Sequence, residues 1–104
     1  MCAAFFVVRA IVPNVSQRAA FDRWYEREHL PDAARSFGVT KAWRFWSLTD
    51  PSLHQATNQV DDEASLDRAM NVEELRRLVA DFNRDWPGIK RARETFVLAQ
   101  EFGT

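Results

Sequence analysis

The chain has 104 residues, enough for a single domain spanning residues 1–104 that buries roughly two thirds of its unfolded surface. Its 14 basic and 15 acidic side chains are interspersed and leave a formal net charge of −1, so we expect neither nucleic acid nor a membrane surface as a partner. Cys2 is the only cysteine, and no Cys/His cluster has zinc spacing. We therefore expect no metal site and a reducing, cytoplasmic setting.

Residues 4–12 form an apolar run rich in Phe, Val and Ile on both alternating faces, which is typical of a central strand. Asn14 or Ser16 can then cap a helix, because apolar and aromatic residues recur after it at spacings of three and four. Pro31 lacks an amide hydrogen and clashes with the preceding turn, so we expect the helix to kink or restart near Leu30 and to end at Gly38.

The rest of the chain predicts two more strands, a short helix, a longer helix and a last strand. Residues 53–60 have the length of a strand but are polar on both faces, and residues 71–74 have the spacing of a capping box. In chain order, these elements are a strand at 39–48, a turn at 49–52, a strand at 53–60, a helix at 64–70, a helix from 71–74 to Pro87-Gly88, and a strand at 91–102.

This order is that of the split βαβ fold, βαββαβ, so we predict an α+β, ferredoxin-like domain. It would contain a four-stranded antiparallel sheet with the helices on one face. The strands also carry apolar and aromatic residues on the other face, which one chain cannot cover. We therefore predict a homodimer in which two such faces pair.

Three segments resemble the dimeric α+β barrel superfamily, most nearly its EthD-like branch, and the resemblance covers nearly the whole chain. Superfamily members include lactone isomerases, polyketide cyclases and cofactor-free monooxygenases. The resemblance implies a ligand cavity between the helices and the sheet, but it does not imply a reaction. The segments are Trp24-Tyr25-x-x-Glu28-His29-Leu30-Pro31, Gly38-Val39 before a Trp-rich strand, and Asp81-Phe82-Asn83-Arg84-Asp85-Trp86 before Arg91 and Arg93.

His29 is the best candidate for acid–base chemistry, because histidine titrates near neutral pH and this one lies within the helix motif. Tyr25 lies one turn earlier on the same helix face, so both side chains can reach one ligand. In the alternative interpretation, His29 braces the helix end with Glu26 or Asp32 as its partner, and Tyr25 fills the core.

His54 enters through the resemblance to the lactone isomerases, because it matches a histidine that those enzymes place after the hairpin turn, while His29 matches their helix histidine. A cysteine of those enzymes has no counterpart here. Strand geometry places His54 ~30 Å along the sheet from the end of the first helix, since a strand rises ~3.3 Å per residue. We therefore expect His54 at the surface near the turn, with ligand binding as the alternative.

Three further residues are candidate ligand contacts, each with a structural alternative. Arg9 interrupts the apolar first strand, so its guanidinium binds either a substrate carboxylate or Glu94 or Glu101 of the last strand. Trp24 and Trp43 offer flat surfaces to an aromatic ligand, but they serve a core equally well. The polar residues of 53–60 either line a wet cavity or form hydrogen bonds across a dimer interface.

No phosphate-binding glycine loop, nucleotide fingerprint or nucleophile elbow is present, so we expect no cofactor. The predicted function is proton or oxygen chemistry on a small hydrophobic or aromatic metabolite, of the kind that isomerases, cyclases and monooxygenases catalyse. The alternative is a non-catalytic homodimer that binds a small ligand or acts as an accessory protein. An apolar pocket of roughly 300 Å³ or more, with the His29 ring opening into it, would favour the enzyme.

Overall fold

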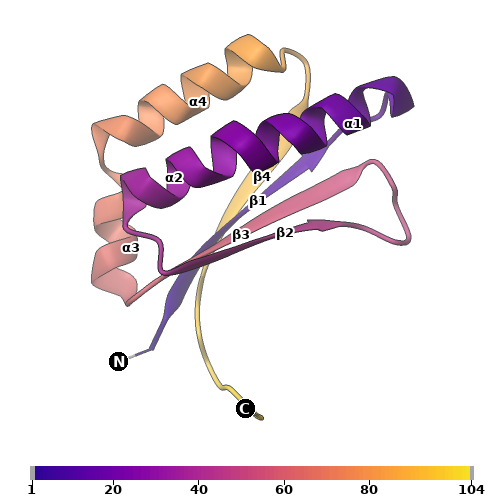
Figure 1. The fold of residues 1–104 in the computed structure, drawn as a ribbon. Helices are drawn as coiled ribbons and strands as arrows, with labels where there is room; N and C mark the ends of the chain where they lie inside the picture. The colour runs from indigo at the N-terminus through magenta and orange to yellow at the C-terminus, as the bar shows by residue number, and fades with distance from the viewer. Residues whose placement is uncertain (1, 104) are drawn as a thin grey trace.

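A computed structural model describes residues 2–103, and its centre is a four-stranded antiparallel sheet (Figure 1). The first strand, β1, lies between β3 and β4, and β2 pairs with the outer side of β3, so the sheet order is β2-β3-β1-β4. This confirms the central position predicted for the first strand. The strands span Ala4–Ile11 (β1), Lys41–Trp46 (β2), Leu53–Val60 (β3) and Lys90–Val97 (β4).

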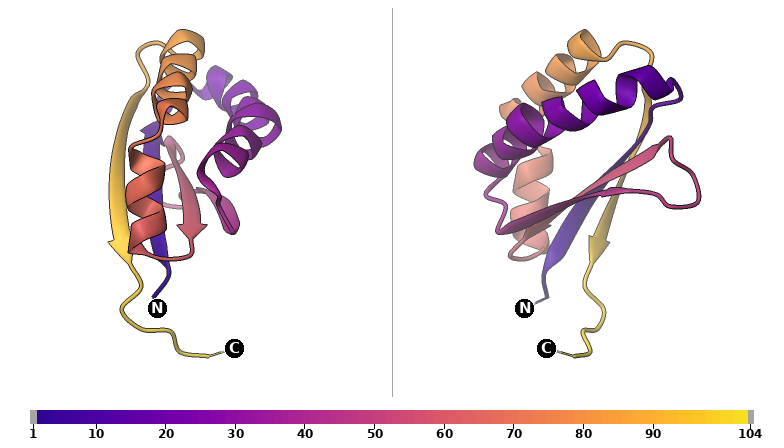
Figure 2. Two further views of the ribbon diagram at one scale, coloured as in Figure 1. Left: turned by 90° about the vertical axis from the view of Figure 1, so that its left-hand side faces the viewer. Right: turned by 45° about the vertical axis from the view of Figure 1, so that its right-hand side comes forward.

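The helices lie on one face of this sheet, and the other face is left without a cover (Figures 1 and 2). The first helical run, residues 15–37, crosses the sheet beside α4 (Glu73–Asp85), while α3 (Glu63–Met70) packs near one end of β1 and β3. The arrangement is the predicted ferredoxin-like α+β fold, with α3 as an additional short helix. The helical elements are α1 (Val15–Trp24), the π-helical turn η1 (Tyr25–His29), α2 (Leu30–Phe37), α3 (Glu63–Met70) and α4 (Glu73–Asp85).

The first helical run remains continuous where a kink or restart was expected near Pro31. The amide of Leu30 donates to the carbonyl of Tyr25, five residues earlier, which is the hydrogen bond of a π turn. Pro31 is the next residue, and it has no amide hydrogen that would need a carbonyl acceptor in the preceding turn. The wider π turn thus accommodates the proline ring without ending the helix. Gly38 ends the helical run with a left-handed φ of 65°.

Two local predictions about helix starts have different outcomes. Asn14 caps α1 as predicted, because its side chain accepts a hydrogen bond from the Ser16 amide at 3.0 Å. The capping box predicted at residues 71–74 is wrong. The Asn71 side chain donates to the Asp67 carbonyl at 2.7 Å, so it closes α3 instead of opening α4, and Val72 at the start of α4 provides no side-chain cap.

The last strand is shorter than predicted, ending at Val97 instead of residue 102. The Leu98 amide still donates to the Ala3 carbonyl at 2.8 Å, but β1 begins at Ala4 and offers no further pairing. Alternation alone therefore overestimated the strand, because a strand lasts only as long as its neighbour.

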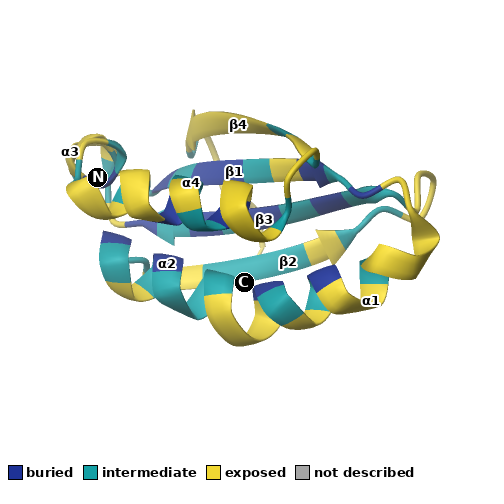
Figure 3. Ribbon diagram, turned by 90° about the horizontal axis from the view of Figure 1, so that it is seen from above, coloured by how far each residue is buried: buried dark blue, intermediate teal, exposed yellow. Residues whose placement is uncertain are grey.

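The core lies between the helices and the sheet, where buried positions line the inner sides of β1 and β3 (Figure 3). One cluster surrounds Phe21 and Phe82, and a second surrounds Phe6, Phe37 and Leu78. Within residues 2–103, no helix is long and apolar enough to cross a membrane.

Candidate functional site

A cavity of about 250 Å³ lies between the helices and the sheet, where the resemblance implied one. It is bounded by η1, α2 and α4 on the helix side and by β1, β3 and β4 on the sheet side. This volume is somewhat smaller than the 300 Å³ expected, and it suits a ligand of one or two rings, since a cavity of about 150 Å³ can hold benzene. Most of its lining is apolar, including Phe6, Val8, Leu30, Ala33, Phe37 and Leu78.

Five polar side chains border this cavity. Tyr25 and His29 reach it from the π turn, Asn58 from β3, and Arg91 and Arg93 from β4. The π turn brings Tyr25 and His29 onto one side of the helical run, with their ring centroids 4.9 Å apart. Turns of this type are frequent at functional sites because they redirect side chains within a helix.

The His29 ring is half-buried and lies parallel to the Trp24 ring, with 4.6 Å between centroids. Burial, and then the charge of Arg91, lower the pKa of His29 from 6.5 to about 4. The imidazole is therefore neutral at pH 7 and can accept a proton or a hydrogen bond. Neither Glu26 nor Asp32 hydrogen-bonds to His29, so the predicted bracing partners are wrong: Arg77 holds Asp32, and Trp24 braces the ring.

Tyr25 is 3% exposed, and burial is the main cause that raises the pKa of its hydroxyl above the usual 10, against the opposing charges of Arg91 and Arg44. The hydroxyl therefore stays protonated at neutral pH. Among residues 2–103 it has no hydrogen-bond partner, although Tyr25 lines the cavity. The arrangement offers a ligand one hydroxyl donor beside one neutral imidazole acceptor.

His54 is completely buried, so the predicted surface position near the turn is wrong. Its Nε2 lies 3.2 Å from a guanidinium nitrogen of Arg44, which in turn binds Asp22 at 3.0 Å. Since arginine can only donate, Nε2 accepts and the ring proton sits on Nδ1, which has no partner among the described residues. Burial first, and then Arg44, lower the pKa of His54 to about 4, so this ring is also neutral.

The two histidines lie much closer to each other than the ~30 Å expected from strand length. The Tyr25 ring contacts both of them. Its centroid is 4.9 Å from His29 and 4.6 Å from His54. The helical run continues about 12 Å beyond His29 to Phe37, at 1.5 Å per residue, before β2 turns back beneath it. β2 therefore runs back toward Tyr25 over the distance by which the helical run had moved away from it. As a result, the start of β3 lies under Tyr25.

The other candidate ligand contacts also lie outside the cavity. Arg9 is exposed on the helix-free face and donates to Gln55 at 2.9 Å, so the predicted ion pair with Glu94 or Glu101 is wrong. Trp43 lies on the same face, beside Thr57. Trp24 contributes only indirectly, as the ring behind His29.

The polar residues of β3 point to both faces of the sheet, and only Asn58 fulfils the expectation of a cavity-lining residue. Asn58 faces the cavity and is 2% exposed, whereas Gln55, Thr57 and Gln59 alternate onto the helix-free face. Asn58 was expected only as one of the polar residues of 53–60 that line a cavity or lie at a dimer interface, and Arg91 and Arg93 only as part of the family resemblance. Asn58 also shares its strand face with the apolar Ala56 and Val60, which indicates that this face is turned inward.

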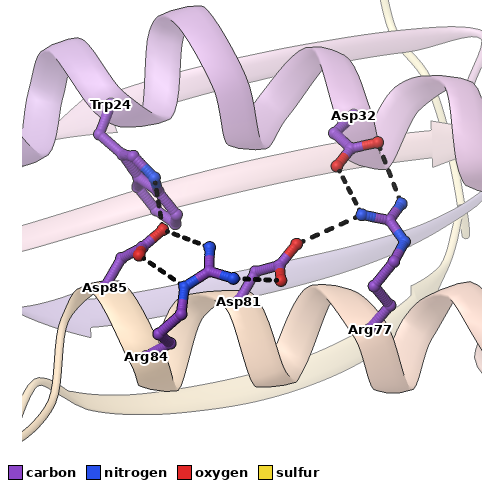
Figure 4. Close-up of polar contacts among 6 residues, drawn as sticks. All are labelled: Trp24, Asp32, Arg77, Asp81, Arg84 and Asp85. Carbon is purple, nitrogen blue, oxygen red and sulfur yellow. Dashed lines mark hydrogen bonds and ion pairs between the residues drawn. The ribbon is translucent and has the colours of Figure 1, made fainter.

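A polar network ties α4 to the first helical run above the cavity (Figure 4). Arg77 donates to both carboxylate oxygens of Asp32, at 3.0 and 3.1 Å, and Trp24 donates to Asp85 at 3.1 Å. Asp81 and Arg84 connect these two contacts along α4. The network holds together the two helical segments that enclose His29.

No group of three His, Cys, Asp or Glu side chains within residues 2–103 has the geometry to hold a metal ion. No family model matches the sequence, and no curated protein matches it.

Solved structures do share the fold at low sequence identity. A mutant form of SnoaB, a cofactor-independent oxygenase from Streptomyces nogalater, matches with a TM-score of 0.74 and 16% identity over 98% of both chains. An ethyl tert-butyl ether d (EthD) family protein from Bacillus halodurans matches at 0.63 and 18% identity, over 90% of this chain and 97% of that one.

A dimeric ferredoxin-like protein from an uncultured marine organism matches with a TM-score of 0.67 and 13% identity, over 98% of this chain and 100% of that one. Together with the strand order β2-β3-β1-β4, these likenesses extend over nearly the whole domain. The chain therefore has the ferredoxin-like α+β fold that these three structures share.

Proposed function

We propose that this protein is a cofactor-independent enzyme that acts on a small aromatic or hydrophobic metabolite by proton or oxygen chemistry. The observation that carries the proposal is the pairing of Tyr25 and His29, 4.9 Å apart, at the edge of an apolar cavity. The likeness to SnoaB, described as a cofactor-independent oxygenase, adds support at the level of the fold.

The protonation states of the two side chains support distinct roles. His29, with a pKa of about 4, is neutral and acts as the general base. Because its conjugate acid is this strong, His29 is a weak base and requires a substrate proton that is already acidic, such as that of a phenol or of a carbon between two carbonyls. Tyr25 keeps its proton and donates a hydrogen bond to the oxygen on which negative charge develops.

The test is turnover of lactones, phenols and polyketide-like aromatics of one or two rings, followed by absorbance and by oxygen uptake. We expect His29→Gln to lower kcat/KM about 10²–10⁴-fold, because glutamine cannot take a proton. Tyr25→Phe removes one hydrogen bond to a charged oxygen and should cost roughly 10–100-fold. The matched control is Glu26→Gln, an exposed change in the same π turn, which should leave turnover unaltered.

Equal turnover by wild type and His29→Gln, with both folded by circular dichroism, would exclude His29 as the base. A second candidate function is supported by the stacking of His29 on Trp24, which is also what a structural brace requires. In that case the protein binds a small ligand without converting it. Ligand binding without turnover in wild type would favour this candidate.

We also propose that two copies pair through the helix-free face of the sheet. Phe45 on β2 and Phe96 on β4 are 49% and 43% exposed there, and no helix covers this face. Phe45→Asp should shift sedimentation toward the monomer. Val15→Asp is the control, because Val15 is 72% exposed at the start of α1, and it should leave the dimer intact. A wild-type monomer at micromolar concentration would contradict the pairing.

A further inference from the structure

Two arginines border the cavity without a carboxylate partner. Arg91 and Arg93 are two residues apart on β4, so their side chains alternate onto the same face of the strand, and both line the cavity. Arg91 lies 4.2 Å from the centroid of the Phe82 ring and donates to the amide oxygen of Asn83 at 3.1 Å. None of the ion pairs among residues 2–103 includes Arg91 or Arg93.

The Arg91 side chain is partly buried, and the exposed Arg93 lies beside it on the same strand face. Burial lowers the pKa of Arg91, and the charge of Arg93 lowers it further, while Tyr25 is uncharged at neutral pH. A partly buried positive charge with a second one beside it is costly unless an anion neutralises it, and this cost falls on Arg91. The arrangement is therefore complementary to a carboxylate or similar anion.

Asn58, on another wall of the cavity, has a buried acceptor atom that needs a hydrogen-bond donor from the ligand. Its amide nitrogen faces the carbonyl of Phe6 at 3.5 Å, and because that carbonyl only accepts, the orientation of the amide follows. The Oδ1 of Asn58 is buried and has no partner among the described residues. A buried acceptor without a donor is unfavourable, so a ligand hydroxyl that donates to it would bind more tightly.

These two polar features face each other across the sheet. Asn58 lies on β3 and Arg93 on β4, and β1 runs between them, so their backbones are separated by about 10 Å, or two strand spacings. Tyr25 and His29 lie above this span, on the helix side. A ligand that meets both requirements carries its donor and its anion at opposite ends of a flat apolar body.

We propose that the cavity binds an aromatic hydroxy acid of one or two rings, with its carboxylate held by Arg91 and Arg93 and its hydroxyl donating to Asn58 Oδ1. This inference rests on the proposed function, because it specifies the ligand of the same cavity. It also places the ring beside Tyr25 and His29. The class excludes neutral hydrocarbons and esters as the preferred ligands.

The test compares three related probes: para-hydroxycinnamic acid, its methyl ester, and cinnamic acid, which lacks the hydroxyl. Their affinities are measured by titration calorimetry with the full chain. We expect the hydroxy acid to bind at least about tenfold more tightly than either of the other two, because each of these lacks one polar contact. Ala33→Phe, which fills the cavity, should abolish the binding of all three.

Variants of the protein then test which residue binds the carboxylate of the ligand and which binds its hydroxyl. Arg93→Met keeps the length of the stem but removes one of the two charges, so it should weaken the acid toward the level of the ester and leave the affinity of the ester unchanged. Asn58→Leu should weaken the hydroxy acid to the level of cinnamic acid and leave cinnamic acid unchanged. Arg76→Met, on the exposed side of α4, is the control and should alter none of the three affinities.

Equal affinity of wild type for the acid and the ester would overturn the proposal, as would failure of all three probes to bind at millimolar concentration. Equal weakening of the acid and the ester by Arg93→Met would overturn it too, since a general loss of structure does not depend on ligand charge. The proposed function is judged separately, by the turnover of His29→Gln. The cavity can thus be catalytic without preferring acids.

Discussion

Tyr25 has a histidine on each side, and the two rings share a lowered pKa of about 4 in different surroundings. His54 is fully buried, and its Nε2 is occupied by Arg44. His29 borders a cavity and has no hydrogen-bond partner among the described residues. A perturbed pKa alone would select both histidines as functional. Access to a ligand separates them, and only His29 has it.

The largest expected effect on stability comes from His54→Ala. This change empties a buried site beside Phe21 and Trp46 and removes one of the two acceptors of Arg44, which keeps Asp22. We expect the free energy of unfolding to fall by about 3 kcal/mol. His29→Ala should cost about 1 kcal/mol, because this ring already borders empty space. Urea unfolding at a fixed protein concentration measures both. Equal losses would show that His54 is not the more structural of the two.

The pH dependence of stability should reflect both histidines between pH 6.5 and 4. Each has a folded-state pKa of about 4, below its value of 6.5 in the unfolded chain, so the unfolded state binds protons first as the pH falls. Their contribution is complete above pH 6.5 and is lost toward pH 4, by at most about 3 kcal/mol per histidine. Stability that does not change between pH 6.5 and 4 would contradict the burial of both rings.

His29→Gln separates the two contributions, because it should remove about half of this slope. The aspartates with a lowered pKa, such as Asp22 and Asp32, affect stability in a lower range of pH. Their stabilisation is present above pH 3.8 and is lost as the pH falls below that value. Urea unfolding across this range, with wild type and variant in parallel, distinguishes the two windows.

The smallest effect is expected from Arg77→Met, which breaks the network above His29 but does not touch the surroundings of His54. The pairing of Arg77 with Asp32 is largely solvent-exposed, so we expect a loss of stability smaller than that of His29→Ala. Arg76→Met is the matched control on the same helix, because its pair with Glu73 is longer, at 3.7 Å, and almost fully exposed. A larger loss from Arg76→Met would contradict the role of the network.

Much of the fold followed from local sequence patterns, and so did the two central residues of the site. Apolar periodicity located the strands and helices, and Asn14 and Gly38 marked the limits of the first helical run as the structure has them. Tyr25 and His29 could be paired because residues four apart in a helix lie on one side. The remaining cavity residues were not identified, since a single Asn or Arg in a strand has no distinctive pattern.

The sequence by itself determined the order of the elements, the faces of the strands and the candidate pair Tyr25 and His29, because these depend on neighbours a few residues apart. Only the tertiary structure decided that His54 is buried, that Arg9 faces away from the cavity, and that Asn58 points into it. Those outcomes depend on where β2 and β3 turn back beneath the helical run. Such contacts join residues far apart in the chain, and packing selects them.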